Sequence, residues 1–367
     1  SADPNPKGIG IIEEDASKYF KTTSYKSREQ TFNPGSYAVS KKSIKISIKK
    51  NLTLSVIIFP TISSSKDQSI IVINNVEIYI NSKGLSTIRV DKKSISIKEP
   101  LELRSWYKIK VKISINGNVS ISQKILKYKD KKEITNKGKL IMNKDASGKV
   151  SLAAIISKGV ASNYFNGKIE SPQITVDNKI IGDWDLSSNT SSTVVDSIVG
   201  PTLILKNFPT RAVTGSKWDS SEMNWQHKPK HYAAIHFHED DIYDFEWDTD
   251  FKLKVPKNIP SGIYTMKIKC DEHEDSMPFF VAPAINKSKA KICVLISTFT
   301  YSIYGNHARV DYDSSWLNRI KEWNAYPHNP ANHKEYGLST YNYHSDGSGI
   351  CHASHRRPLF NLSLIHI

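Results

Sequence analysis

Cysteine is scarce in this sequence, and its few copies are scattered. The 367 residues include three cysteines, Cys270, Cys293 and Cys351, and no two of them form a CxxC pair. An odd number of widely spaced thiols does not build a disulfide framework. The sequence therefore predicts free thiols in a reducing compartment.

Long hydrophobic runs are absent as well. No apolar stretch approaches the roughly 20 residues that a membrane-spanning helix needs. Residues 1–30 also lack the apolar segment of a signal peptide. We therefore expect no membrane partner and a cytoplasmic location.

The net charge is strongly positive, yet no basic cluster accounts for it. Lysine and arginine number 51 and aspartate and glutamate 36, which gives a formal net charge of +15. Clustered basic residues would favour nucleic acid or an anionic membrane. The lysines here alternate with isoleucine and serine, as at Lys108, Lys110 and Lys112, which is typical of the solvent face of antiparallel strands. We therefore expect no nucleic-acid partner.

Histidine is missing from the first half of the chain. All 12 histidines lie at or beyond His227, and six of the seven tryptophans lie at or beyond Trp184. Neither half contains internal repeats or low-complexity segments. This distribution predicts that the first half is a scaffold and that the second half carries the chemistry.

Short alternating runs rich in β-branched residues dominate the first half. Turn formers such as Ser82-Lys83-Gly84 and Asn116-Gly117-Asn118 separate them, and many short strands at close spacing predict a β-sandwich. The opening of one run by Trp106-Tyr107 is similar to the laminin-G or concanavalin-like pattern. The predicted strands are Ile44–Ile48, Leu52–Phe59, Ile70–Ile73, Val76–Ile80, Tyr107–Ile113 and Val119–Ile125, with Asn163–Ile169 as the closing strand.

The C-terminal part of the chain has a different texture. Ala290–Ile296 is a continuous apolar run, which is typical of a strand buried on both faces of a parallel sheet. A loop rich in Thr and Tyr is expected next. Ser315–Asn324 then has the spacing of an amphipathic helix, with Trp316, Ile320 and Trp323 on one side. These signals predict the opening β-α unit of an α/β domain.

The predicted fold class is therefore multidomain, β plus α/β. Residues 1–40 form a lead-in segment, and residues 41–180 form a laminin-G/concanavalin-like β-sandwich. Residues 181–285 form a β-rich linking domain. Residues 286–367 form the N-terminal part of an α/β catalytic domain, which we expect to be truncated at Ile367.

Tyr336–Pro358, with the sequence YGLSTYNYHSDGSGICHASHRRP, combines three tyrosines, three histidines, three glycines, an aspartate, a cysteine and two arginines. With so little aliphatic content it does not fill a core, so we predict that it forms the wall of a reactive site. His344 and Asp346 lie among glycines, where backbone freedom lets polar groups turn toward a ligand. They are candidate catalytic residues that orient water or support a metal, although stabilising the turn itself is the alternative role.

Several strings resemble the large (beta) subunit of N,N-dimethylformamidase and its relatives. The resemblance covers roughly residues 160–362, whereas the lysine-rich first 150 residues match only in architecture. The strings are Asn163–Ile169, Asn207–Gly215, Ile235–Asp241, Ser297–Asn306, Tyr326–Pro330 and Tyr336–Gly349.

That resemblance implies hydrolysis of the amide bond of small N-substituted formamides such as dimethylformamide. It implies a mononuclear Fe³⁺ ion held by two tyrosine phenolates and a glutamate, in a large subunit that forms a hetero-oligomer with a small helical one. Carried over, Tyr341 is one phenolate and Tyr301 the other, with Tyr304 as the alternative. The glutamate would lie beyond Ile367, so the fragment is expected to be inactive alone.

The chemistry of the residues agrees with this implication, because a phenolate is a hard anionic donor that suits a trivalent ion. Without the resemblance, the same tyrosines are half-buried aromatics at strand ends.

Other interpretations stay open. His236 and His238 on one strand place both imidazoles on one face, which suits a zinc hydrolase, although spacing supplies no third ligand and a polar contact between domains is the other interpretation. Cys351 beside His352 suggests a thiol nucleophile, but sequence neighbours seldom form such a dyad. A carbohydrate- or protein-binding sandwich without amidase activity is the remaining alternative.

Overall fold

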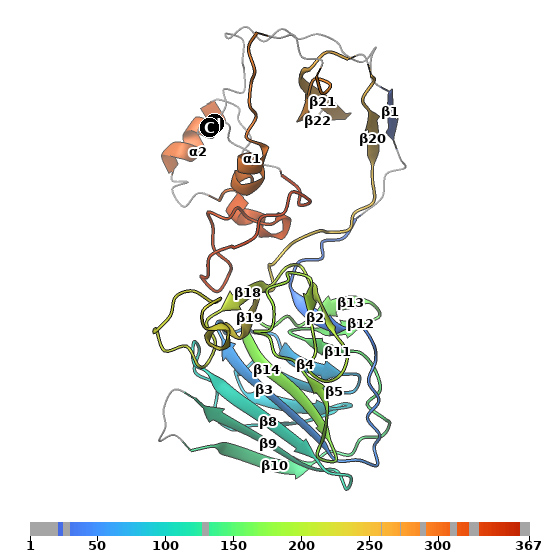
Figure 1. Cartoon of the computed structure of the whole chain (residues 1–367), viewed down its shortest axis with the longest axis vertical. Coiled ribbons are helices and arrows are strands. Elements are labelled where there is room, and N and C mark those ends of the chain that lie inside the picture. Colours follow the sequence, from blue (N-terminus) through green and yellow to red (C-terminus); the bar gives the residue numbers. More distant parts are fainter. Residues whose placement is uncertain are drawn as a thin grey trace.

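Two antiparallel β-sheets of eight strands each form the lower body of the protein in Figure 1, a computed structural model. The structure describes residues 21–24, 30–126, 132–257, 259–271, 273–286, 291–308, 314–322 and 330–359. Among these residues, no helix is long and apolar enough to cross a membrane.

The first sheet has the strand order β10-β9-β8-β3-β14-β19-β18, and β15 also pairs with β14. Its strands are β3 (Leu52–Pro60), β8 (Tyr107–Ile113), β9 (Asn118–Ile125), β10 (Ile134–Lys139), β14 (Gly167–Val176), β15 (Lys179–Asp183), β18 (Thr210–Val213) and β19 (Ala234–Phe237). β14 lies between β3 and β19 in this sheet, and the predicted closing strand, Asn163–Ile169, overlaps it only from Gly167 to Ile169.

The second sheet has the strand order β16-β17-β2-β11-β4-β5-β6-β7. Its strands are β2 (Tyr37–Ser40), β4 (Gln68–Ile73), β5 (Val76–Ile80), β6 (Ser86–Val90), β7 (Lys93–Ser96), β11 (Val150–Leu152), β16 (Val194–Val195) and β17 (Leu203–Lys206). Both sheets take strands from beyond residue 180, so neither sheet ends at the predicted boundary, and the division into domains stays a prediction.

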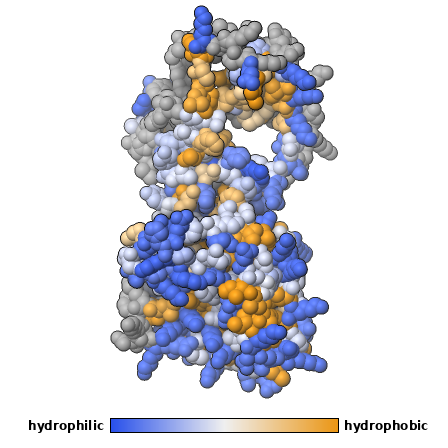
Figure 2. Space-filling view, in the orientation of Figure 1, coloured by the Kyte–Doolittle hydropathy of each residue, from blue (hydrophilic) through white to orange (hydrophobic). Residues whose placement is uncertain are grey.

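The core lies between the two sheets and follows from the alternation of the sequence. Along β8, Ile109 and Val111 are fully buried, whereas Lys108 and Lys112 are exposed. Ile71 of β4 faces the same core from the other sheet. Each such aliphatic side chain stabilises the fold by about 1.5–3 kcal/mol. The outward lysines fit the hydrophilic surface over much of the lower body in Figure 2.

Most of the predicted strands in the first half are confirmed by β3, β4, β5, β8 and β9. Ile44–Ile48 is the exception, because Ile44 forms only an isolated bridge with Gly148. Asp145 accepts the N–H of Ile48 through its side chain, so this segment is fixed by a loop and not by a strand partner.

The remaining elements lie outside the two large sheets, and several of them form the upper part of Figure 1. They are β1 (Lys21–Ser24), β12 (Ile155–Ser157), β13 (Val160–Ser162), β20 (Phe251–Lys254), β21 (Gly262–Cys270), β22 (His273–Val281), α1 (Thr298–Tyr304), α2 (Ser314–Glu322), and the 3-10 helices η1 (Pro229–Tyr232), η2 (Pro330–Asn332) and η3 (Lys334–Tyr336). β1 pairs with β20, β12 with β13 and β21 with β22, all antiparallel.

The predicted buried strand at the start of the α/β domain is wrong for the part that is described. Residues 291–296 form no strand, and Ile292, Val294 and Leu295 are 80%, 73% and 91% exposed. A strand buried on both faces needs neighbouring strands, and no described strand pairs with this run. Ala290 lies outside the described residues.

The two segments that follow are helical. α1 occupies part of the run in which the sequence predicted a loop. The amphipathic helix is confirmed as α2, but the side chains of Trp316, Ile320 and Trp323 lie outside the described set.

Candidate functional site

The polar segment singled out in the sequence forms a tight turn from His344 to Ser348. The His344 N–H donates to the carbonyl of Ser348 (2.8 Å), and the Gly347 N–H donates to the carbonyl of His344 (2.9 Å). Gly347 has a φ of +81°, a region that glycine adopts without strain. Asp346 Oδ1 accepts the N–H and the hydroxyl of Ser348 at 2.9 and 2.5 Å. One oxygen of Asp346 therefore stabilises the turn.

The His-x-His motif lies at the end of β19 in the first sheet. The ring centroids of His236 and His238 are 4.0 Å apart, and both side chains are buried, so the prediction that they share one face is confirmed. β14 supports this end of the strand, where Gly167 is opposite Phe237. A Cβ at Gly167 would lie 2.3 Å from the carbonyl oxygen of Phe59, so only glycine permits this approach.

The turn and the His-x-His motif meet in a buried cluster of imidazoles and carboxylates. His236 Nε2 lies 3.0 Å from Asp346 Oδ2, and His238 Nε2 lies 2.9 Å from Ser348 Oγ. Arg104 also donates to the backbone carbonyl of Asp346 (3.0 Å). In Figure 1 this C-terminal segment, drawn in red, extends toward the sandwich near β18 and β19. The two site motifs of the sequence thus lie in one cluster.

Two aspartates that sequence reasoning did not assign complete the cluster. His344 Nδ1 lies 2.8 Å from Asp240 Oδ1, and His238 Nδ1 lies 3.1 Å from Asp241 Oδ2. The rings of His238 and His344 stack at 3.8 Å with an interplanar angle of 8°. Asp241 also accepts the hydroxyl of Ser36 at 2.5 Å. The signal in the sequence that could have found them is the acidic run Glu239–Asp241 directly after His238.

Burial and nearby carboxylates shift the pKa values of His236 and His344 in opposite directions. Burial lowers the pKa of His236 to about 4, although the hydrogen bond with Asp346 opposes this. Burial also acts to lower the pKa of His344, but the hydrogen bond to Asp240 and the nearby carboxylates outweigh it and raise the pKa. Burial would raise the pKa of Asp346, yet hydrogen bonds from His236 and Ser348 hold it well below its usual range. Asp346 is therefore ionised in the cluster.

Two groups of side chains in this cluster could hold a metal ion. The first is His236, His238 and Asp346, and the second is His238, Asp241 and His344. In each group the ligand atoms lie within 4.8 Å of one another, and all these residues are buried. In the first group, Asp346 is the residue that could act as a third ligand beside the two histidines.

The candidate phenolates lie in α1 and in the loop that precedes the His344–Ser348 turn. The ring centroids of Tyr304 and Tyr341 are 5.0 Å apart, whereas the ring of Tyr301 lies 6.2 Å from that of Phe280. Tyr341 is 60% exposed. The structure thus brings the alternative candidate, Tyr304, against Tyr341.

Hydrogen bonds from the C-terminal segment fix the end of α1. Arg357 donates to the carbonyls of Ser302 and Gly305 at 2.9 Å each, and Ser339 Oγ donates to the carbonyl of Ile303 (2.7 Å). Asn306 donates to the carbonyl of Gly337 (2.9 Å). These contacts hold Tyr304 in place beside the segment that carries Tyr341.

Two other features of the sequence take no part in this arrangement. Cys293 and Cys351 are free and exposed, as predicted, and the side chain of Cys270 lies outside the described residues. Cys351 Sγ contacts the carbonyl of Gly349 (3.6 Å). The structure therefore gives no support to a thiol nucleophile at Cys351.

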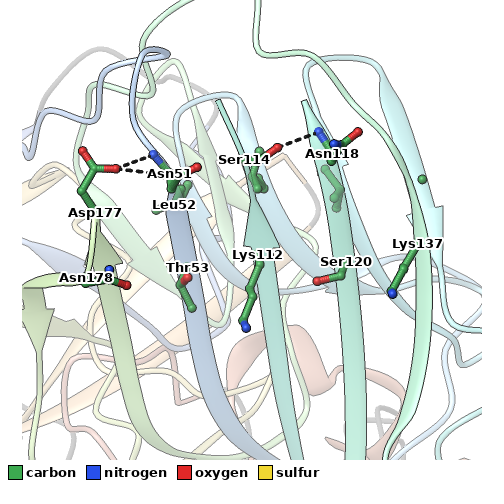
Figure 3. Close-up of a pocket in the computed structure, with 13 residues that line it drawn as sticks. Asn51, Leu52, Thr53, Lys112, Ser114, Asn118, Ser120, Lys137, Asp177 and Asn178 are labelled. Carbon is green, nitrogen blue, oxygen red and sulfur yellow. Dashed lines mark hydrogen bonds between the residues drawn. The ribbon is translucent and has the colours of Figure 1, made fainter. Parts of the chain in front are cut away.

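A polar groove of about 730 Å³ lies at the opposite end of β3 and β14 from the cluster. Figure 3 shows Thr53, Lys112, Ser120 and Lys137 side by side on its floor, with Asp177 at one edge. No aromatic ring is among its lining residues. It lacks the stacking platform that an aromatic ring would provide for a sugar.

Comparison with known proteins finds a family that is similar to the C-terminal part of the chain. Residues 210–363 match the family described as N,N-dimethylformamidase beta subunit-like, C-terminal. The N,N-dimethylformamidase beta subunit of Paracoccus aminophilus is 40% identical over 166 residues, which make up 44% of this chain and 22% of that protein. The beta subunit of an Alcaligenes species is 38% identical over 166 residues with the same coverage. The chain thus spans about a fifth of the length of these relatives.

Similarity to solved structures is weaker. A SAP-like heptameric pentraxin from Limulus polyphemus is 15% identical with a TM-score of 0.29, covering 42% of this chain and 75% of the pentraxin chain. A similarity at this level has no bearing on function. The family match, in contrast, covers the part of the chain that contains β19, α1 and the His344–Ser348 turn. For residues 210–363 it confirms the resemblance to the N,N-dimethylformamidase beta subunit that the motifs predicted.

Proposed function

We propose that this chain is part of the large subunit of an amide hydrolase that cleaves small N-substituted formamides such as dimethylformamide. The observation that carries the proposal is the identity of about 40% to two N,N-dimethylformamidase beta subunits. Those relatives are named as subunits, which supports a hetero-oligomer with a small helical subunit as the partner. The location of the protein stays a prediction.

The site of this activity is proposed at Tyr341 and a tyrosine of α1. Tyr304 is favoured over Tyr301 because its ring is the one that packs against Tyr341. The exposure of Tyr341 leaves its phenol accessible to an ion or a substrate. Two adjacent phenols fit a ferric ion, because each can supply a hard anionic oxygen. Such an ion would contribute Lewis-acid activation of the amide carbonyl.

His344 and Asp346 are proposed to act as positioning residues for Tyr341. Both side chains are buried and take part in hydrogen bonds of the cluster, so they fix the turn that follows Tyr341. Asn342 adds a second restraint, because its amide Nδ2 donates to the carbonyl of Ala308 (2.7 Å) and its Oδ1 accepts the Ala308 N–H (2.9 Å). The resemblance also implies a glutamate as the third ligand. The tyrosines and the turn residues of this site do not include one.

The proposal is tested with Tyr341→Phe, Tyr304→Phe and Tyr301→Phe in the complete large subunit, assembled with its small subunit. Each change removes one phenol oxygen and keeps the ring. We expect the first two variants to lose bound iron, the visible absorption of an iron phenolate and formamide hydrolysis. Tyr301→Phe should retain them.

Tyr343→Phe is the matched control, because Tyr343 is 67% exposed and lies two residues from Tyr341. This variant should keep iron and activity. Iron content and hydrolysis that survive both Tyr341→Phe and Tyr304→Phe would refute the assignment of the phenolates. Absence of formamide hydrolysis by the assembled wild-type enzyme would refute the substrate class.

A further inference from the structure

The amide-hydrolase proposal assigns no metal to the buried group His236, His238 and Asp346, and it gives only Asp346 a role, as a positioning residue. We propose that these three side chains form a binding site for one divalent transition-metal ion of the zinc class. The ion would join the end of β19 to the His344–Ser348 turn.

The spacing of the three ligand atoms fits a tetrahedral ion. Zinc binds imidazole nitrogen and carboxylate oxygen at about 2.0–2.2 Å, so two ligands of a tetrahedral site lie roughly 3.3 Å apart. His236 Nε2 lies 3.0 Å from Asp346 Oδ2, and His238 Nε2 lies 3.6 Å from the same oxygen. These two separations bracket the expected value.

In two of the ligands, the polar atom that would not bind the ion already has a hydrogen-bond partner, as is usual in metal sites. His238 Nδ1 lies 3.1 Å from Asp241 Oδ2, and Asp346 Oδ1 accepts two hydrogen bonds from Ser348. Imidazoles that bind metal almost always donate their other N–H to such a partner. Asp241 is in turn held by Ser36 (2.5 Å). The cluster therefore orients both ligands from outside.

The second ring nitrogen of His238 faces the proposed ion position. His238 Nε2 lies 2.9 Å from Ser348 Oγ and 3.6 Å from Asp346 Oδ2. With the Nδ1 proton facing Asp241, the Nε2 lone pair of a neutral ring would be available to an ion. The side chain of His238 is 1% exposed, so such an ion would be shielded from solvent.

The donor set selects the class of ion. Two imidazoles and one carboxylate suit zinc and its neighbours among the transition metals, whereas calcium and magnesium prefer oxygen ligands alone. The second possible group, which includes Asp241 and His344, is less suitable, because its two imidazole rings stack parallel at 3.8 Å. Asp346 and its two imidazoles are therefore the site.

The test measures zinc binding by the 367-residue chain after treatment with a chelator. Zn²⁺ is titrated in competition with a chromophoric chelator, and Co²⁺ is added separately as a spectroscopic probe of tetrahedral nitrogen and oxygen ligands. We expect one ion per chain. His236→Gln and Asp346→Asn should each weaken binding by about 100-fold or more, and Asp241→Asn by about 10- to 100-fold.

His227→Gln is the matched control, because His227 is an exposed histidine paired with Glu222 (3.1 Å). It should bind zinc as the wild type does, as should Tyr341→Phe, which separates this site from the proposed iron site. Circular dichroism checks that each variant is folded. The Co²⁺ spectrum of the wild type tests the site even if a variant fails to fold. Wild-type protein that binds neither ion, or His236→Gln and Asp346→Asn proteins that bind zinc as tightly as the wild type, would overturn the proposal and leave a purely hydrogen-bonded junction.

Discussion

The imidazole of His236 and the carboxylate of Asp346 are 110 positions apart in the sequence and 3.0 Å apart in the structure. Their side chains are only 8% and 1% exposed. The contact joins the end of β19 in the first sheet to the segment that carries Tyr341. The geometry of the proposed active site therefore depends on the sandwich, although the sandwich contributes no phenolate to it.

Asp346→Ala should open the turn without unfolding the sandwich. Removing the carboxylate from its buried hydrogen bonds with His236 and Ser348 costs about 1.5–3 kcal/mol. We expect the amides of His344 and Gly347 to exchange with deuterium about 10- to 100-fold faster, because each 1.4 kcal/mol corresponds to a factor of ten. Both amides bond to backbone carbonyls and not to Asp346 itself. The measurement is hydrogen exchange with a chelator present.

Asp196→Ala is the control for this change, since Asp196 accepts a hydrogen bond from Asn189 at an exposed position. Exchange at His344 and Gly347 should be unaltered in it, and the amides of β8 should stay protected in both variants. If the turn amides of Asp346→Ala exchange as slowly as those of the wild type, the hydrogen bonds of Asp346 do not hold the turn.

Local patterns were sufficient to predict five strands of the two sheets, β3, β4, β5, β8 and β9. The alternation of Ile109 and Val111 with lysines states which face of β8 is buried, and the structure agrees. The turn at His344–Ser348 was also indicated by its glycines. In both cases the determining contacts lie within a few residues, so the sequence contains them.

The partners of the site histidines could not be predicted in this way. His344 bonds to Asp240, which is 104 positions away, and only the fold brings the two together. The contact between Tyr304 and Tyr341 likewise depends on helix α1, which the sequence did not predict. Contacts between distant segments leave no periodic pattern in a single sequence, so they could not be predicted from it.

Gly167→Ala should destabilise the sheet where it supports β19. The φ of +149° disfavours alanine, and the new Cβ would lie 2.3 Å from the carbonyl oxygen of Phe59. Such backbone strain costs about 1–3 kcal/mol, and the steric clash adds to it. Gly159→Ala is the control, because its φ of +84° is also positive but nothing lies within 4 Å of the added Cβ. Equal losses in the free energy of unfolding, measured with urea, would argue against a tight approach at Gly167.

Glu170→Gln should stabilise the protein at neutral pH. Burial raises the pKa of Glu170 above its ordinary 4.5, although hydrogen bonds from Ser216 oppose this. A folded-state pKa above the unfolded one gives stability that is present below pH 4.5 and is lost as the pH rises through the folded-state value. Glutamine keeps the shape and avoids the buried charge.

The free energy of unfolding of Glu170→Gln should therefore exceed that of the wild type at about pH 7, and the two should converge below pH 4.5. Urea denaturation at both pH values measures this. Glu246→Gln is the control, since its carboxylate is 78% exposed and pairs with Lys206 at 3.7 Å. It should change stability by less than about 1 kcal/mol. A Glu170→Gln protein that is less stable than the wild type at neutral pH would contradict a raised pKa.

Leu295→Lys decides between the strand that the sequence predicted and the exposed run that the structure has. Leu295 is 91% exposed, so the lysine should change local stability by less than about 0.5 kcal/mol. In a strand buried on both faces the same change would place an unpaired charge in a core and cost several kcal/mol.

The readout is deuterium exchange of the Tyr301 and Gly305 amides, which form the hydrogen bonds of α1 just after this run. Leu54→Lys, in the fully buried core of β3, shows the size of a true core effect through its loss of free energy of unfolding. Fast exchange of α1 in Leu295→Lys would mean that Leu295 packs in a core after all.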